Sequence, residues 1–583
     1  MSASIDSNSS QSGPDSALRQ WDAWVQHLES RDSPCPPTDL FQCDSSRFLH
    51  WGLPVEIDPA DLEQFDRTAP SASASQSWAT RIDTWIAAAS SAPPTPAFAY
   101  DSLAWCHQLP WLGRFLAASA WTDLLKTLSE LANTAQDFPA MDAPLAYTLL
   151  AGELGLTLHY LFPELDSCRY LQNSSCDALN TSIIDLVDGE GLPHANDIAI
   201  SRALLASWTR CEQLSRSAET SCFDDDARAQ FEWAVRHAVL LTRKDGSQLF
   251  TPAIADTSWH HCCVAALEQA GDEVDWYLAS HSILKPSQRT AYHQNFADVN
   301  PANLPPLAIH SEWSELTIMR TGRDRPQQQL ALRYDQPIMN MELIHRGQSL
   351  LHGDWTTEIS VDGQKLGPGH EWDVTCWFSD RDADYLEVQI DLDQDWKLQR
   401  QILLAHKDKF LYVADAMLGS TPSLIEYTSR LPLPSQAHFQ AADKTHEGIL
   451  HTGRHGTLVL PLACPEWRTE ESSGQLRENL DTLEYRCQVT ARNLYAPLFF
   501  DLSRAGVTKP FTWRRLTVAE SLAIQSPEVA TGYRVQIGSR QWLTYRSLDP
   551  PANRTILGQN LSNEFVFGRF DRKGEVQELI GVE

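Results

Sequence analysis

The residues most suited to chemistry begin with a short polar segment, DGEGLPH, at residues 188–194. Its two glycines and its proline favour an irregular loop, which brings His194 to the start of a predicted helix. The partial positive charge of a helix N-terminus attracts carboxylates. We therefore predict that His194 is catalytic and that Asp188 and Asn196 bind the substrate. The alternative is a loop in which the Asp and Asn side chains only cap backbone amides.

A second cluster of candidate residues consists of His345, Arg346, His352, Asp354 and Trp355. The two histidines are seven residues apart, and this odd separation places them on opposite faces of a continuous strand. They can cooperate only if a turn at residues 346–348 intervenes. We then expect His352 to be catalytic, Arg346 and Asp354 to bind substrate, and Trp355 to stack on a ring of the substrate. The alternative is an exposed polar hairpin.

The segment WHHCC at residues 259–263 has the residue types of a metal site, but its spacing is unsuitable. Neighbouring helical residues point about 100° apart, so His260 and His261 cannot easily bind one ion. We expect packed core thiols here, no metal and no cofactor. The twelve cysteines include no CxxC pair, which indicates reduced thiols. The sequence also has no HExxH, Walker or GxSxG motif, which excludes the common zinc protease, nucleotide-binding and hydrolase classes.

Helical spacing dominates the first half of the chain, from about residue 77 to residue 282. Two apolar stripes show it best, Ile200, Ala203, Leu204, Trp208 and Cys211 in one helix and Phe231, Ala234, Val235, Ala238 and Leu241 in another. Stops at residues 162–163 and 244–246 indicate helix pairs. Residues 1–76 are predicted to be disordered or irregular, with a polar loop at residues 69–76.

The pattern changes after a Pro-rich segment at residues 300–306, which we interpret as a linker. Apolar residues alternate with polar ones over residues 386–393, which predicts a strand with one face in water. Similar short runs recur at residues 316–320, 329–334, 410–414, 533–537 and 564–570, and Asp362-Gly363 predicts a hairpin turn. Many strands without intervening helices indicate an antiparallel sandwich.

Two segments resemble the heparinase II/III-like family of polysaccharide lyases. The first, IIDLVDGEGLPHANDIAISRALLASWTRC at residues 183–211, resembles the family's Asp-Gly loop and the long helix after it. The second, SELTIMRTGRDRPQQQLALRYDQPIMNMELIHRGQSLLHGDW at residues 314–355, is similar to the first strands of the family's sandwich. The resemblance implies a multidomain α and β fold. An incomplete (α/α) toroid would occupy residues 77–299, and an antiparallel β-supersandwich residues 307–583.

The resemblance also implies a reaction, β-elimination next to a uronic acid. One group neutralises the carboxylate, a base removes the proton at C5 and an acid protonates the departing oxygen. The family uses Asn, Tyr and His residues that converge between its two domains. This sequence departs from that pattern, because the expected Tyr falls near Ile198 and no histidine occurs in the segment QPIMNM at residues 336–341.

Two functions remain open at this point. One is a polysaccharide lyase that acts on an acidic polysaccharide or oligosaccharide, with His194 as the base and His352 as the acid. The other is a catalytically inactive protein of the same fold that binds a glycan or a protein partner. The missing Tyr and His favour the second function, and the Asp188-Gly189 loop favours the first.

The net charge of −30 disfavours nucleic acid and anionic membrane as partners, because the average field repels phosphate. A polyanionic sugar is repelled in the same way, so a lyase needs a local basic pocket. The first twenty residues have no basic start and no apolar core, and no apolar run is long enough to span a bilayer. These features predict a cytoplasmic protein. The sequence does not predict the oligomeric state.

Overall fold

The structure is a computed structural model of the chain. It describes residues 14–42, 46–63, 65, 72–89, 91–251, 257–284, 299–323, 328–469, 472, 474–503, 506–571 and 573–583. The chain divides into two compact units, Met1–Leu304 and Pro305–Glu583. The division falls inside the Pro-rich segment at residues 300–306, where the described residues include a short 3-10 turn, Pro301–Asn303.

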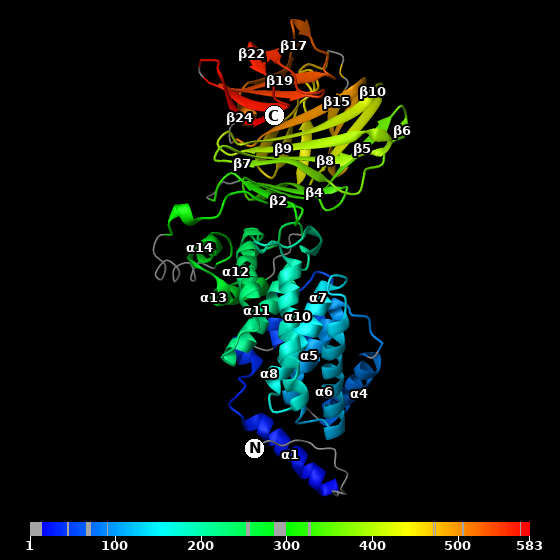
Figure 1. Cartoon of the computed structure of the whole chain (residues 1–583), viewed down its shortest axis with the longest axis vertical. Helices are drawn as coiled ribbons and strands as arrows, with labels where there is room; N and C mark the ends of the chain where they lie inside the picture. Colours follow the sequence, from blue (N-terminus) through cyan, green and yellow to red (C-terminus); the bar gives the residue numbers. More distant parts are fainter. Residues whose placement is uncertain are drawn as a thin grey trace. The chain divides into compact units, whose positions relative to one another are not determined.

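The first unit is built from helices (Figure 1). Their bounds are α1 Pro14–Ser30, α2 Pro37–Leu40, α3 Pro59–Glu63, α4 Ala72–Ala89, α5 Pro96–Leu112, α6 Ala118–Thr134, α7 Pro144–Tyr147, α8 Gly155–Leu161, α9 Asp166–Arg169, α10 Leu171–Leu186, α11 Ser201–Ser217, α12 Asp225–Leu240, α13 Thr257–Ala270 and α14 Glu273–Ser282. A π-helical segment, Thr148–Leu154, joins α7 to α8. Among the described helices, none combines the length and the apolar character needed to cross a membrane.

The prediction that residues 1–76 are irregular is wrong for much of its described part. Helix α1 begins at Pro14, and helix α4 includes residues 72–76 of the predicted polar loop; residues 1–13 and 69–71 lie outside the described residues. The physical reason is an apolar stripe in α1. Trp21 and Trp24 contact Trp121 of α6, with ring centroids 5.5 and 6.1 Å away. These contacts secure α1 to the core of the helical unit.

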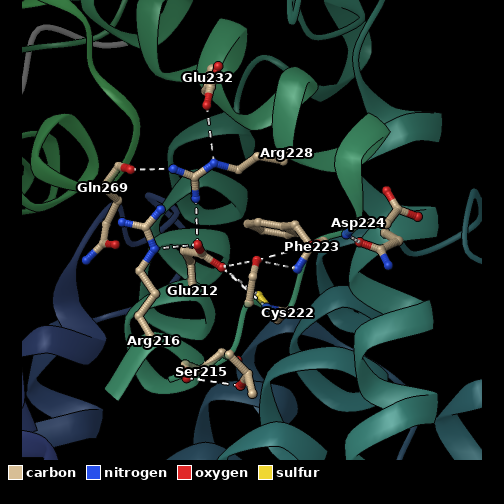
Figure 2. A network of polar contacts seen from close by, with 12 residues as sticks. Glu212, Ser215, Arg216, Cys222, Phe223, Asp224, Arg228, Glu232 and Gln269 are labelled. Atoms are coloured by element: carbon tan, nitrogen blue, oxygen red, sulfur yellow. Dashed lines mark hydrogen bonds and ion pairs between the residues drawn. The ribbon is translucent and has the colours of Figure 1, made fainter. Parts of the chain in front are cut away.

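The two predicted amphipathic helices are present as α11 and α12. Most residues of their apolar stripes are buried, as the spacing predicted. A buried carboxylate, that of Glu212 in α11, also connects the two helices (Figure 2). It accepts hydrogen bonds from Arg216 Nε at 2.7 Å and from Arg228 Nη1 of α12 at 2.5 Å. Arg228 also donates to the backbone carbonyl of Gln269 at the end of α13, so three helices are held together.

The second unit is built from strands. Their bounds are β1 Ile309–Ser311, β2 Leu316–Arg320, β3 Gln328–Arg333, β4 Met339–His345, β5 Gln348–Val361, β6 Gln364–Lys365, β7 Asp373–Ser379, β8 Ala383–Asp391, β9 Lys397–Ala405, β10 Phe410–Pro432, β11 Ala437–Ala441, β12 Gly448–Thr452, β13 His455–Pro461, β14 Gly474–Asn479, β15 Thr482–Asp501, β16 Phe511–Leu516, β17 Val518–Glu520, β18 Ala523–Ile524, β19 Ala530–Ile537, β20 Arg540–Ser547, β21 Arg554–Ile556, β22 Gln559–Leu561, β23 Phe565–Phe570 and β24 Val576–Val582. The predicted runs at residues 316–320, 329–334, 410–414, 533–537 and 564–570 all fall in or at these strands.

The strands pair antiparallel in three sheets. The large sheet has the order β1-β2-β3-β4-β5-β10-β15-β13-β12-β11, and further strands branch from this path. The five-stranded sheet has the order β16-β19-β20-β23-β24, and the small sheet has the order β18-β17-β21-β22. The predicted turn at Asp362-Gly363 is confirmed, because Val361 pairs with Gln364 across it.

The first part of β10, residues 410–417, is buried on both faces of the large sheet. On β10, Leu411 and Val413 belong to one hydrophobic core, whereas Phe410 and Tyr412 belong to a second core. The second core also contains residues of the five-stranded sheet, among them Trp542 and Phe565. This part of the large sheet therefore lies between two cores, and strand alternation divides its side chains between them.

The prediction of a strand with one wet face at residues 386–393 holds only in part, because Asp391 and Asp393 are exposed. Strand β8 is present, but Glu387 on its polar face is only 3% exposed. Its carboxylate makes an ion pair with Arg546 of β20 at 2.9 Å and accepts a hydrogen bond from Gln401 at 3.2 Å. The alternating sequence identified the two faces of β8 correctly. It could not show that a second sheet covers the polar face at Glu387.

Candidate functional site

The polar loop of the helical unit is organised by Asp188. One oxygen of its carboxylate accepts hydrogen bonds from the backbone N–H groups of Glu190 and Leu192, each at 2.9 Å. The Asp188 backbone N–H donates to the Leu192 carbonyl at 2.9 Å, and Val187 pairs with Pro193. This oxygen of Asp188 therefore caps backbone amides, as the alternative interpretation predicted, and its hydrogen bonds shape the loop. Binding of substrate by Asp188 stays a prediction.

Gly191 fixes this loop against helix α12. Its φ of +79° is unfavourable for residues with a side chain, and an added Cβ would lie 2.5 Å from the backbone nitrogen of Ala234. The same added atom would lie 2.6 Å from Cβ of Trp233, so the loop is seated beside that residue. The Trp233 side chain is 40% exposed, and the Arg236 guanidinium lies 4.7 Å from its ring centroid.

Sequence reasoning missed Trp233 as a candidate residue. Its signal was its position, because it lies outside the apolar stripe of α12 that contains Phe231, Ala234 and Val235. A large aromatic residue on the polar side of an amphipathic helix is a candidate for ligand contact.

His194 was predicted to stand at the start of a helix, and the helix that it precedes is only a short one. His194 precedes a 3-10 turn of three residues, Ala195–Asp197, and α11 begins only at Ser201. The half-buried His194 accepts a hydrogen bond at Nδ1 from the backbone N–H of Asn196 at 3.2 Å. A single turn has little dipole, so the expected carboxylate attraction by a helix end does not apply here. Asn196 is exposed, and its role in substrate binding stays a prediction.

The position where the resemblance implies a tyrosine is occupied by a buried residue. Ile198 is 1% exposed, and its carbonyl accepts a hydrogen bond from the Gln248 side chain. Gln248 also lines a small cavity between the loop and helices α10, α11 and α12, together with Arg202 and His237. The cavity has a volume of about 30 Å³, which is room for a water molecule or two rather than a sugar ring.

In the sandwich unit, the predicted turn at residues 346–348 is confirmed as a hairpin between β4 and β5. His345 pairs with Gln348, and Arg346 and Gly347 between them have φ values of 55° and 77°. Both signs are those of a type I′ turn. His345 itself is only 4% exposed. Its burial and the neighbouring Arg346 charge lower the pKa of His345 to about 4.

His352 lies on β5 directly opposite Glu342 of β4. The side chain of His352 is 33% exposed, whereas that of Glu342 is 1% exposed, and His352 Nδ1 lies 3.6 Å from Glu342 Oε2. A partly exposed imidazole backed by a buried carboxylate is the arrangement that orients a catalytic histidine. Sequence reasoning missed Glu342. Its signal was a single charge inside the otherwise apolar stretch MELI at residues 341–344.

Asp354 lies on the same face of β5 as His352, two residues further along the strand. Asn340, its cross-strand partner on β4, donates a hydrogen bond from Nδ2 to Asp354 Oδ1 at 2.8 Å. Arg333 of β3 pairs with Asn340 in the next register position. The Arg333 guanidinium is held by both oxygens of Asp335, at 2.9 and 2.8 Å. His352, Glu342, Asn340, Asp354 and Arg333 therefore form one polar strip across three strands, hereafter the β3–β5 strip.

Arg346 does not belong to this strip. It lies at the hairpin turn, where its Nη1 donates to His455 Nδ1 at 3.1 Å. His352 lies four positions after Gln348, which corresponds to about 13 Å along β5. Arg346 and His352 thus occupy different parts of the hairpin. A carboxylate bound by Arg346 would not lie at the His352 imidazole.

Trp355 is not a surface for a sugar ring, and this prediction is wrong. It is 3% exposed and belongs to the core on the face opposite His352. Its Nε1 donates to Ser429 Oγ at 2.7 Å, and the Arg400 guanidinium covers its ring at 3.7 Å from the centroid. The sequence could not distinguish this role, because an odd step along a strand moves a residue from one face to the other.

The segment at residues 259–263 lies on α13, where Cys262 and Cys263 are buried in the core of the helical unit. His260 is buried and His261 is exposed, so the two rings lie in different environments. Within the described ranges, no group of three or more His, Cys, Asp or Glu residues is arranged to hold a metal ion. The eleven cysteines that the structure describes are free thiols.

Comparison with known proteins gives a result for the fold alone. No protein-family model matches the sequence, and no curated protein matches it. Among solved structures, a heparinase III has a TM-score of 0.61 at 12% identity, over 91% of this chain and 95% of that one. Heparan sulfate lyase HepC from Pedobacter heparinus has a TM-score of 0.53 at 12% identity, over 92% and 95%. The chain therefore has the heparinase fold, a helical toroid followed by an antiparallel β-sandwich, as the sequence resemblance implied.

Proposed function

We propose that this protein is a polysaccharide lyase that cleaves uronic-acid-containing glycans by β-elimination. The observation that supports it is the pairing of a partly exposed His352 with the buried carboxylate of Glu342. The fold supports it at the level of analogy, since one of the similar structures is a heparan sulfate lyase.

The ion-pair contact between His352 and Glu342 suggests a different role for His352 from the one that the sequence predicted. Glu342 favours a proton on Nδ1 of His352, which leaves the Nε2 lone pair as a base for the C5 proton. Loss of the C5 proton and cleavage of the C4–oxygen bond form the C4–C5 double bond, and the departing oxygen takes a proton. His352 is thus proposed as the base, and the role of His194 stays a prediction from the sequence.

The other residues of the β3–β5 strip can hold the sugar. Asp354 and Asn340 are suited to the hydroxyl groups of a ring, since one accepts and the other both accepts and donates hydrogen bonds. Arg333, which pairs in register with Asn340, is the cation of the strip that can bind the uronate carboxylate, and Asp335 already holds it. Binding of a uronate there requires Arg333 to share its charge between two carboxylates.

The test is an assay for the unsaturated uronate that elimination creates, followed by its ultraviolet absorbance across a panel of uronic-acid polysaccharides. We expect product with at least one polymer, and a loss of at least a hundredfold in kcat for His352→Ala. His370→Ala is the matched control, because His370 is an exposed histidine of the same unit. The proposal fails if no polymer yields product, or if His352→Ala and His370→Ala are equally active.

A second candidate function is glycan binding without cleavage. Two observations favour it: Ile198 is buried and apolar where the resemblance implies a tyrosine, and Arg333 is occupied by Asp335. Under this alternative, calorimetric titration detects binding of the same polysaccharides while the absorbance assay stays silent. Replacement of His352 by Ala then leaves the binding affinity within about twofold.

A further inference from the structure

A groove in the helical unit has the size and the lining of a carbohydrate site. It lies between helix α6 and the junction of α9 with α10, and its volume is about 460 Å³. Small-molecule sites commonly have volumes of about 300 to 1,000 Å³. The polar and aromatic side chains that line it include Thr122, Lys126, Glu130, Asn133, Ser167 and Tyr170.

The exposed aromatic ring of Tyr170 indicates which class of ligand the groove can bind. Its side chain is 81% exposed at the point where α9 ends and α10 begins. An exposed aromatic ring presents an apolar face in water, and the axial C–H groups of a pyranose ring pack well on such a face. Tyr100 of α5, by contrast, is fully buried in the core. The ring is therefore available to a ligand in the groove.

The rest of the groove supplies hydrogen-bonding groups at helical spacing. Thr122, Lys126, Glu130 and Asn133 follow one another along one side of α6. Asn133 donates one N–H to the Ser129 carbonyl at 3.0 Å, and its Oδ1 can accept a hydrogen bond from a hydroxyl group. Lys126 and Glu130 lie 3.6 Å apart, with side chains 70% and 65% exposed. Because this exposed ion pair is weak, Lys126 can donate a hydrogen bond to a sugar hydroxyl group and Glu130 can accept one at little cost in stability.

Local charge also distinguishes this groove from the whole protein. One lysine and one glutamate line it, so the lining is neutral, whereas the chain carries a net charge of −30. A glycan is not repelled by the lining itself. Recognition through ring stacking and hydroxyl groups does not require a charged sugar, in contrast to the elimination reaction, which requires a uronate.

We propose that the α6–α9 groove binds one pyranose residue of a glycan chain, stacked on Tyr170. The site has no part in the elimination chemistry, and the proposal does not depend on that activity. Its role would be to hold a polymer to the enzyme and raise the local concentration of further sugar units.

The experiment is calorimetric titration of the full chain with a glucuronic-acid-containing hexasaccharide and with its carboxyl-reduced, neutral counterpart. We expect both to bind, Tyr170→Ala to weaken each at least tenfold and Tyr170→Phe to bind within about twofold of the original chain. Asn133→Ala should weaken binding several-fold. Trp467→Ala is the control, because Trp467 is an exposed aromatic residue, 49% accessible, outside the groove.

Hydrogen exchange of the α6 backbone at residues 122–133 provides a second readout, since a ligand in the groove should slow it. Unchanged affinity in Tyr170→Ala, absence of binding, or binding of the charged sugar alone would each overturn the proposal. The result is separable from the lyase assay. Groove binding without any eliminated product defeats only the proposed function, and product without a Tyr170 effect defeats only this inference.

Discussion

At the scale of single residues, the buried partner of His352 is the sharpest test of the proposed chemistry. We expect Glu342→Gln to lower kcat by about 10- to 1,000-fold, because the amide no longer favours the imidazole tautomer with a free Nε2. The pH dependence of kcat should change as well, which a purely structural defect would not cause. Glu426→Gln, an exposed glutamate of β10, is the control. Equal kcat values and equal pH profiles for the two variants would contradict the pairing.

Trp355 provides a second residue-scale prediction, now about stability. Trp355→Ala should lower the free energy of unfolding by about 3 to 5 kcal/mol, because it removes a buried ring and uncovers Arg400. Denaturant unfolding measures this, with the half-exposed Trp313→Ala as a comparison that should cost less than about 1 kcal/mol. A small effect of Trp355→Ala would mean that the ring does not support the core.

The sequence predicted residue types well and residue environments poorly. His352 and Asp354 were predicted as neighbours on a hairpin, and they do share one face of β5. Trp355 was assigned to the same surface, although its odd offset places it in the core. Glu342 and Trp233 were missed because each is distant in sequence from the group it accompanies. Cross-strand register and loop seating determine such neighbours, and neither can be read from local spacing.

At the scale of elements, the loop at residues 188–194 depends on one glycine far more than on the other. Gly191→Ala should destabilise the helical unit by more than about 1 kcal/mol, because φ is positive and the added Cβ meets the α12 backbone. Gly189→Ala is the matched control, since nothing lies within 4 Å of its added Cβ. Thermal unfolding of the two variants compares them directly. Equal midpoints would show that the loop is not seated on α12.

Element types followed from local periodicity, whereas element surroundings did not. The apolar stripes of α11 and α12 and the alternation of β8 predicted the correct classes. The polar face of β8 was expected in water, yet it is covered at Glu387, because strands more than a hundred residues later form the second sheet. Helix α1 was missed for a related reason. The segment before it is rich in serine, and the apolar stripe of α1 is partly buried through its contact with Trp121 of α6.

At the scale of the whole molecule, acid should weaken the fold at a defined pH range. Burial lowers the pKa of both His345 and His310 to about 4, below the ordinary value of 6.5, so each ring is neutral in the folded chain. The unfolded chain binds protons more readily, and the stability contribution of each ring is present above pH 6.5 and lost as pH falls towards 4. Urea unfolding at several pH values should show this decline. The decline should be shallower in His345→Gln, and an unchanged slope would contradict the assignment.

The large sheet has a consequence for how this protein can change over generations. Strand β10 contributes Leu411 and Val413 to one core and Phe410 and Tyr412 to the other. A substitution that shifts the backbone of β10 disturbs the packing of both cores, so few combinations of residues pack well in both at once. Mutational drift should therefore be slow along β10 and faster at exposed positions such as those around Tyr170. The strand between the two cores therefore preserves the architecture, while new binding surfaces can arise elsewhere without changing it.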